Sequence, residues 1–235
     1  MSIIRESERL IRFVRFGLVN SFLVIEEDGL TLIDASLRGA GSKILSAARK
    51  LALPIQRIVL THAHIDHVGS LDALRQRLPQ AEILIGTREA RLLSGDLSLL
   101  PGESGKRPFG FIHVNAQPTR MLQDGERIGS LQVISSPGHT PGHFSFLDTR
   151  DGSLISGDAL TTQFGILVAG TFQPLFPFPA LFCWNRELGT ESALKLRGLH
   201  PTRLASGHGS TINIPVAAMD QAIALAFRQS GKVLN

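Results

Sequence analysis

The chain has 235 residues, of which 43% are hydrophobic and 19% charged, and it carries a formal net charge of +4. A chain of this length and hydrophobicity can bury one sizeable core, so we expect a single domain over residues 1–235. Lysine and arginine form no run, which argues against a nucleic-acid partner. Cys183 is the only cysteine, which excludes an intrachain disulfide, a thiolate metal cage and a C-x-x-C redox pair.

The first part of the chain predicts a β-rich opening followed by alternating helices and strands. Strands are expected over 10–16, 21–26, 30–33, 58–60 and 82–85. Helices are expected over 39–51, 68–78 and 87–93. Residues 27–29 form the turn between the second and third strands, because an acidic pair followed by glycine is typical of a hairpin.

The second part repeats the order of strands before helices. Residues 94–115 are rich in glycine and proline, and a connection this long often serves as a lid or rim over a site. Strands follow over 131–135, 144–147, 153–155 and around Leu204, and helices over 186–196 and 215–229. The last helix would bury Ala218, Ala222, Leu225 and Ala226. Two β-then-α halves predict an α/β fold, an αβ/βα sandwich with helices outside two packed sheets.

One uncharged stretch, Phe164 to Trp184, is long enough to span a membrane. Pro174, Pro177 and Pro179 would interrupt a helix there, so we interpret the stretch as an apolar loop with a turn of helix, without stable membrane insertion. The first twelve residues contain no apolar core of a signal peptide, and we therefore expect a cytoplasmic protein.

The most informative segment follows the strand that ends at Leu60. It places His62, His64, Asp66 and His67 within six positions. Imidazole and carboxylate are ligands that Zn²⁺ accepts, and a turn at a strand end can direct these side chains toward two adjacent metals. Asp66 could instead begin the following helix, but helix capping needs one such residue and not four.

Three further strand ends offer donors. His139 and His143 lie in a turn of glycine and proline, and Asp158 and His208 each end an apolar run. In a layered α/β protein, strand ends on one edge converge, so these residues could meet the first cluster in one cleft. A single loop histidine such as His208 would more often be satisfied by backbone groups.

Together, the H-x-H-x-D-H element, the later P-G-H-T-P-G-H, the G-D and the final G-H resemble the metallo-β-lactamase superfamily. The resemblance implies a four-layer αββα sandwich and a centre of two Zn²⁺ ions, with Fe, Mn or Co as other divalent metals. It implies that His62, His64 and His139 hold one metal, that Asp66, His67 and His208 hold the second, and that Asp158 bridges both.

A protein with such a centre would be a dinuclear zinc hydrolase, in which a metal-bridging hydroxide cleaves an ester-like bond. Asp66 is the candidate for proton transfer to the leaving group. Asp34 and His143 match no ligand position, and we interpret them as groups that orient the ligands. Ordinary hydrogen bonding at a turn and a strand end is the alternative for these two residues.

The expected substrate is a small, partly apolar lactone or acyl ester. Lactonases of this superfamily place a tyrosine near the metals, whereas this chain has none, and Phe164 could line the same region. The second predicted function is that of a thioesterase similar to glyoxalase II. Cys183 matches no ligand position, which disfavours β-lactam hydrolysis. A non-hydrolytic metal-binding protein and an iron-dependent redox protein are further alternatives.

The apolar stretch 164–184 contains five phenylalanines and one tryptophan but no charged residue, so it could wall the cleft against an acyl or aromatic group. It could equally be core or the contact of a homodimer.

Overall fold

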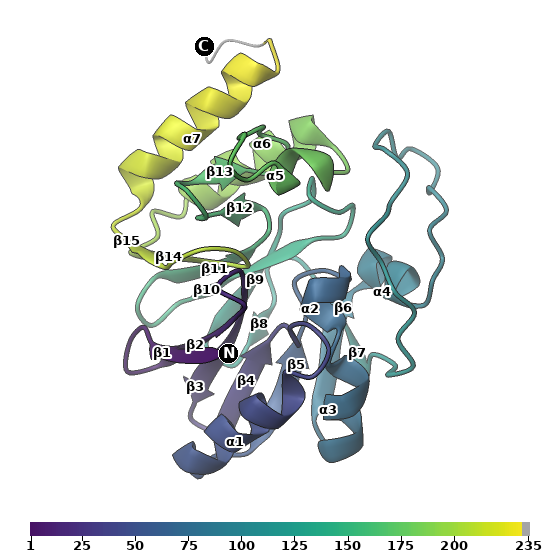
Figure 1. The fold of residues 1–235 in the computed structure, drawn as a ribbon, viewed down its shortest axis with the longest axis vertical. Coiled ribbons are helices and arrows are strands. Elements are labelled where there is room, and N and C mark those ends of the chain that lie inside the picture. Colours follow the sequence, from purple (N-terminus) through teal and green to yellow (C-terminus); the bar gives the residue numbers. More distant parts are fainter. Residues whose placement is uncertain (232–235) are drawn as a thin grey trace. The chain divides into compact units, whose positions relative to one another are not determined.

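The computed structural model describes residues 1–231. The chain forms two compact units (Figure 1). The N-terminal unit comprises Met1–Asp96 and Gly110–Leu122. The C-terminal unit comprises Leu97–Phe109 and the chain from Gln123 onward. The single domain over residues 1–235 stays a prediction.

The N-terminal unit is built on a seven-stranded sheet in the order β1-β2-β3-β4-β5-β6-β7. The strands are β1 (Ser2–Arg5), β2 (Leu10–Arg15), β3 (Val19–Glu26), β4 (Gly29–Ile33), β5 (Ile55–Val59), β6 (Glu82–Gly86) and β7 (Arg120–Leu122). Neighbours from β1 to β4 pair antiparallel, and those from β4 to β7 pair parallel. The predicted turn between β3 and β4 is confirmed. Gly29 closes it at φ +138°, where an added Cβ would lie 2.6 Å from the Pro54 carbonyl oxygen.

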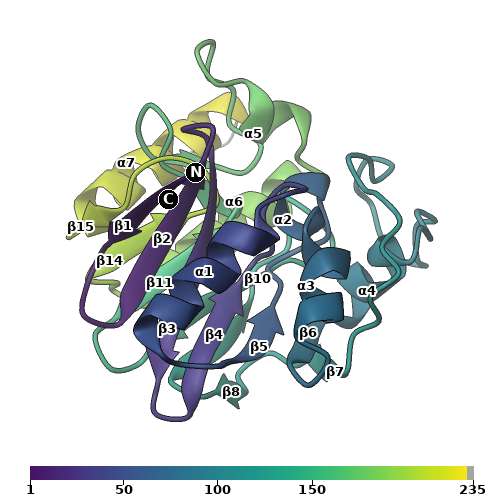
Figure 2. The same ribbon diagram turned by 60° about the horizontal axis from the view of Figure 1, so that its bottom comes forward.

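The helices of this unit are α1 (Gly41–Leu51), α2 (Ile65–Val68), α3 (Leu71–Arg77) and α4 (Thr87–Leu93). Helices α1 and α3 pack side by side (Figure 2). The predicted helix over 68–78 is confirmed only in part: α3 covers Leu71–Arg77, whereas Val68 ends α2 and the chain breaks at Gly69 and Ser70. Gly69 passes so close to the chain at Arg38 that a Cβ would lie 2.6 Å from the Arg38 nitrogen. The Ser70 hydroxyl donates to the Leu37 carbonyl and accepts from the Ala40 N–H, so tertiary contacts hold the break.

The C-terminal unit contains a six-stranded sheet in the order β15-β14-β11-β10-β9-β8 and a separate pair, β12-β13. The strands are β8 (Arg127–Ile128), β9 (Leu131–Ser135), β10 (Phe144–Asp148), β11 (Ser153–Gly157), β12 (Leu160–Thr161), β13 (Leu167–Val168), β14 (Arg203–Ser206) and β15 (Ile212–Asn213). The helices are α5 (Phe178–Leu181), α6 (Arg186–Arg197) and α7 (Val216–Gln229).

Helices α6 and α7 pack against each other and against β13. The predicted apolar face of α7 is partly wrong. Ala222 and Ala226 are buried as expected, but Met219 and Ile223 complete the face, whereas Ala218 and Leu225 are half-buried. In a helix this rich in alanine, spacings of three and four residues are compatible with more than one apolar face. Only packing against α6 and β13 decides which face is buried.

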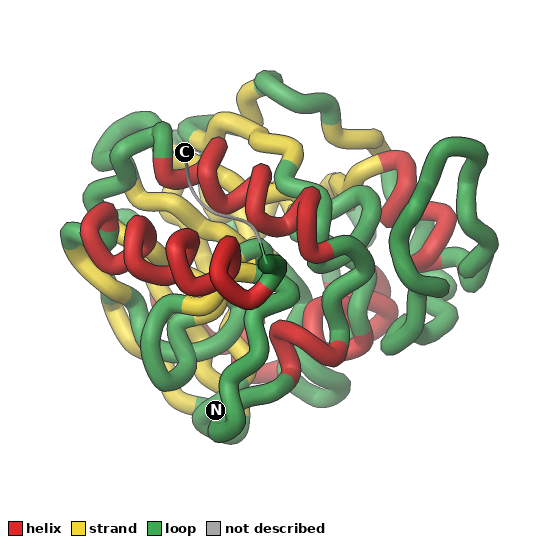
Figure 3. Tube along the Cα trace, turned by 90° about the horizontal axis from the view of Figure 1, so that it is seen from above, coloured by secondary structure: helices red, strands yellow, loops and turns green. Residues whose placement is uncertain are grey.

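The segment between α4 and β7 contains no helix or strand, as predicted for 94–115 (Figure 3). The stretch 164–184 contains the predicted turn of helix, α5, but it also contains the short strand β13, which was not predicted and which pairs with β12. Within residues 1–231, no helix combines the length and the apolar character needed to cross a membrane.

Candidate functional site

The N-terminal unit gathers its predicted donors at one edge of its sheet. Strands β4, β5 and β6 run parallel, so their carboxyl ends share an edge. The segment from His62 to His67 follows β5 at that edge. His62 Nε2 lies 3.1 Å from His64 Nδ1, and the rings of His62 and His67 are 4.0 Å apart between centroids. All three imidazoles are buried. Three clustered imidazoles are a donor set suited to a borderline divalent cation.

Asp34 follows β4 and holds this segment through three contacts. Its Oδ1 accepts from the Thr61 N–H at 2.8 Å, and its Oδ2 accepts from the Thr61 hydroxyl at 2.8 Å. His67 Nδ1 lies 2.7 Å from the same Oδ2. A carboxylate at Nδ1 places the imidazole proton there and directs the Nε2 lone pair away from it, the arrangement usual for a metal-ligating histidine. Asp66 Oδ2 lies 3.7 Å from that Nε2.

Three contacts to the His62–His67 segment were not foreseen from the sequence. The Ala63 N–H donates to Glu89 Oε2 at 2.9 Å, and Glu89 is fully buried on α4. The Phe111 ring lies 4.6 Å from the His64 ring between centroids, and the Ile65 N–H donates to the Gly110 carbonyl at 3.1 Å. In the sequence, Glu89 belongs to an ordinary amphipathic pattern, so no local feature distinguishes it from a solvent-exposed glutamate. Its role follows only from where α4 packs.

The C-terminal unit likewise places its donors at one sheet edge. Strands β9, β11 and β14 run in the same direction, because β10 is antiparallel to both β9 and β11 while β14 is parallel to β11. His139, Asp158 and His208 follow these three strands. Asp158 Oδ2 lies 3.0 Å from His208 Nε2 and 3.5 Å from His139 Nε2. One carboxylate oxygen thus lies between two imidazoles, and all three side chains are buried.

His143 holds the backbone beside Asp158. Its Nε2 accepts from the Asp158 N–H at 3.1 Å, which assigns the ring proton to Nδ1, 2.9 Å from the Ser136 hydroxyl. Ser136 in turn lies 2.8 Å from the Ser145 hydroxyl, which donates to the Ser156 carbonyl. His143 is therefore engaged through both ring nitrogens in a chain of hydrogen bonds that connects the ends of β9, β10 and β11.

Phe164, the predicted substrate contact, is exposed, whereas Cys183, which matches no predicted ligand position, is buried. Phe164 lies in the turn between β12 and β13, with a backbone φ of +59° and 58% of its surface exposed. Cys183 is buried and its thiol lies 3.3 Å from the Gly138 carbonyl. Burial raises the pKa of that thiol to about 11, so it is a neutral hydrogen-bond donor near neutral pH and not a thiolate.

The donor chemistry of each unit fits divalent metal ions. Imidazole nitrogen and carboxylate oxygen together suit Zn²⁺ and also Fe, Mn and Co. Burying a carboxylate such as that of Asp158 is costly unless hydrogen bonds or a cation compensate for the lost hydration. The two imidazoles beside Asp158 give it the surroundings in which such an ion binds.

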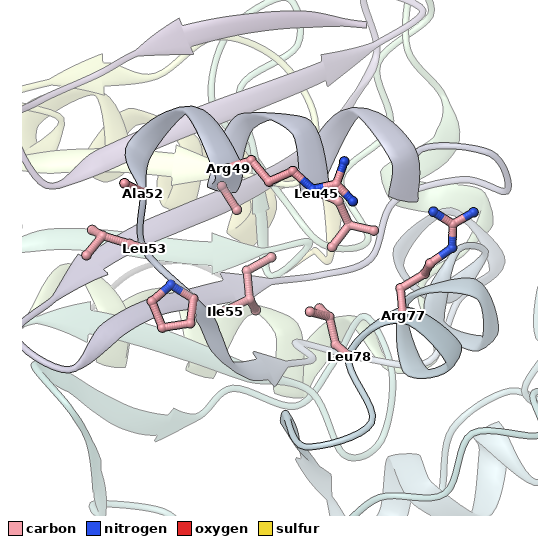
Figure 4. A pocket seen from close by; sticks show the side chains of 9 residues that line it. Leu45, Arg49, Ala52, Leu53, Ile55, Arg77 and Leu78 are labelled. Atoms are coloured by element: carbon pink, nitrogen blue, oxygen red, sulfur yellow. The ribbon is translucent and has the colours of Figure 1, made fainter.

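A cavity of about 470 Å³ lies elsewhere in the N-terminal unit, between the end of α1, the start of β5 and the end of α3 (Figure 4). Its lining is largely aliphatic, with Arg49 and Arg77 as its charged residues. None of the predicted donors lines it, so it is separate from the candidate metal ligands.

Comparison with known proteins gives consistent matches over most of the chain. The sequence profile of the Metallo-beta-lactamase superfamily matches residues 14–208. YobT of Bacillus subtilis is 48% identical over 207 residues, covering 87% of this chain and 89% of YobT. A hydroxyacylglutathione hydrolase of Xanthomonas axonopodis is 30% identical over 207 residues, covering 84% of this chain and 72% of that enzyme.

Solved structures agree with the sequence matches. TTHA1623 in a di-iron-bound form superposes with a TM-score of 0.65 at 26% identity, covering 87% of this chain and 94% of that structure. The predicted metallo-β-lactamase-like sandwich fold is confirmed by such neighbours together with the mixed α/β sheets.

Proposed function

Because this chain belongs to the metallo-β-lactamase superfamily, we propose that it is a dinuclear zinc hydrolase that cleaves an ester-like bond in a small, partly apolar substrate. The coarser assignment, a metal-dependent hydrolase, follows from the family and from its relatives. The observation that carries the finer one is the Asp158 carboxylate between two imidazoles, since a carboxylate in that setting suits a bridge between two ions.

The ligand roles are proposed from the superfamily's motif order. His62, His64 and His139 would serve one ion, and Asp66, His67 and His208 the other, with Asp158 shared. When bound, two divalent ions lower the pKa of a water toward neutrality and polarise the carbonyl that is attacked.

The protein's own groups have separate tasks. Asp34 fixes the tautomer and orientation of His67, and His143 fixes the backbone at Asp158. Asp66 has a partly exposed carboxylate, with 24% of its side chain accessible. A carboxylate that contacts both water and a donor ring is placed to pass a proton to a departing alkoxide, which is the role we propose for it.

Lactones and acyl esters are the first proposed substrates, and thioesters are the second. The thioester alternative is favoured by the similarity to the hydroxyacylglutathione hydrolase of Xanthomonas axonopodis. The iron alternative is favoured by the di-iron form of TTHA1623.

The test is metal content per chain by emission spectrometry, with hydrolysis of an aryl ester, a γ-lactone and a thioester measured before and after chelation. We expect two zinc ions per chain and activity that chelation abolishes and zinc restores. Asp158→Ala should retain fewer than two ions and lose at least about a hundredfold in kcat/KM.

Asp124→Ala is the matched control, because Asp124 is an exposed carboxylate in the same unit that pairs with Lys195. It should retain both ions and full activity. A wild-type protein without bound metal, or hydrolysis that survives chelation, would overturn the proposal. Two iron ions with an inert substrate panel would replace it by the redox alternative.

A further inference from the structure

A series of aromatic rings in the C-terminal unit ends against a predicted metal ligand. The Phe109 and Phe182 rings stack with centroids 4.9 Å apart. Phe182 and Phe178 follow at 6.1 Å, and Phe178 and Phe176 at 5.2 Å. The Phe176 ring then lies 5.8 Å from the His208 ring. We call these four phenylalanines, Phe109, Phe176, Phe178 and Phe182, the phenylalanine series.

The series is anchored to a second predicted ligand through Trp184. The backbone N–H of Trp184 donates to the His139 carbonyl at 3.0 Å, and the backbone N–H of Asn185 donates to the Gly138 carbonyl at 2.9 Å. The residue after Phe182 also belongs to this anchor, since the Cys183 thiol contacts the Gly138 carbonyl. The segment that bears the rings is therefore joined to the loop of His139 as well as to His208.

The loop Leu97–Phe109 supplies the outermost ring of the phenylalanine series, Phe109. The Lys106 N–H donates to the Trp184 carbonyl at 2.9 Å. Gly105 packs flat on the indole, so that a Cβ there would lie 2.1 Å from the ring. Phe109 is thus brought onto Phe182 by a loop bound to Trp184, and the long connection predicted as a lid or rim is held in place at this point.

Burial changes along the series. Phe176, next to His208, is 3% exposed, whereas Phe178 and Phe109 are each 46% exposed. The rings therefore lead from a buried donor to the surface of the unit. Apolar surface left in water is unfavourable unless a ligand or partner covers it.

We propose that the phenylalanine series binds the acyl or aromatic part of the substrate and makes the enzyme selective for medium-length apolar acyl groups. The proposal rests on the proposed hydrolase function. The occupant follows from continuity, because the inner end of the series touches His208, and His208 contacts the Asp158 carboxylate. An acyl chain whose carbonyl lies at these donors extends along the rings toward Phe178.

The test is kcat/KM of the zinc-loaded enzyme for 4-nitrophenyl esters from acetate to decanoate. Each methylene covered by the rings should raise kcat/KM roughly two- to fourfold until the series is filled. Phe178→Ala should lower the decanoate value roughly 5- to 20-fold and the acetate value less than twofold. Phe172→Ala is the control, since Phe172 is a similarly exposed phenylalanine of the same stretch outside the series, and it should keep the wild-type dependence on chain length.

A second measurement separates this inference from the hydrolase proposal. Trp184 is the only tryptophan and the chain has no tyrosine, so its emission reports on this segment alone. The decanoate anion should change the Trp184 emission at concentrations at which the acetate anion does not. Phe178→Ala should weaken this change in emission. If no ester is hydrolysed but decanoate still binds in this way, the hydrolase fails and the apolar site stands.

Two results would overturn the inference. Ester hydrolysis that is independent of chain length in the wild type leaves the hydrolase and removes the acyl site. A Phe178→Ala protein with the wild-type chain-length dependence but half the wild-type mass by light scattering would show that the series is instead a contact between two copies of the chain.

Discussion

The two units present their donor residues by different means. In the N-terminal unit, His62, His64, Asp66 and His67 come from one segment, and carboxylates from elsewhere in that unit, Asp34 and Glu89, brace it. In the C-terminal unit, His139, Asp158 and His208 come from three strand ends, whose order in the sheet brings them together. A dense local motif still depends on remote groups for its geometry. Dispersed donors depend on strand register and on a backbone contact from His143.

This comparison predicts that the bracing residues differ in what their loss affects. Asp34 touches a donor ring directly and also holds Thr61, so its removal should lower both metal affinity and stability. His143 touches the backbone of a donor residue, so its removal should act first on stability.

The largest effect is expected for Asp34→Ala, which removes the acceptor of two Thr61 donors and the partner of the His67 ring. The free energy of unfolding should fall by about 3–5 kcal/mol in urea denaturation. Asp34→Asn is the control for the backbone, because asparagine tolerates the φ of +61° at this position. It should cost less stability but still lower metal affinity about 10- to 100-fold in chelator competition. Unchanged affinity in Asp34→Asn would show that Asp34 does not act through His67.

A smaller effect is expected for His143→Ala, which breaks the contacts to Ser136 and to the Asp158 N–H. Unfolding in urea should become easier by about 2–3 kcal/mol. At temperatures where the variant is folded, its metal affinity should fall less than that of Asp34→Asn. His113→Ala, a change at an exposed histidine, should leave both quantities close to wild type. The contrast between the units is refuted if His143→Ala loses more metal affinity than Asp34→Asn.

The smallest effect is expected from pH at Cys183. Burial raises the pKa of this thiol to about 11 in the folded protein, above the value of about 8.5 in an unfolded chain. The neutral thiol therefore stabilises the fold fully below about pH 8.5, and this contribution is lost as pH rises toward 11. Cys183→Ala should show a shallower decline of stability between pH 8 and 10. Equal slopes in the two proteins would contradict the assignment.

Several elements were predictable because their causes are local. Helix α4 begins and ends at the predicted residues, and α6 starts where expected because Asn185 caps it, accepting from the Glu187 and Leu188 N–H groups. The turn at Gly29 follows from its residue types. The positions of the candidate donors could be read for the same reason, since imidazoles and carboxylates at strand ends are visible in a single stretch of sequence.

The remainder depended on contacts between distant segments. The break between α2 and α3 arises from the approach of the chain at Leu37 and Arg38, and the strands β12 and β15, each of two residues, exist only beside their partners. Glu89 became a bracing group through the packing of α4, and Phe109 joined Phe182 through the loop fastened to Trp184. The sequence by itself determined the family, the periodic elements and the candidate donors, because residue type and spacing encode them. Only the tertiary structure decided which buried groups hold those donors and which rings lie beside them, because such contacts join residues that are far apart in the sequence.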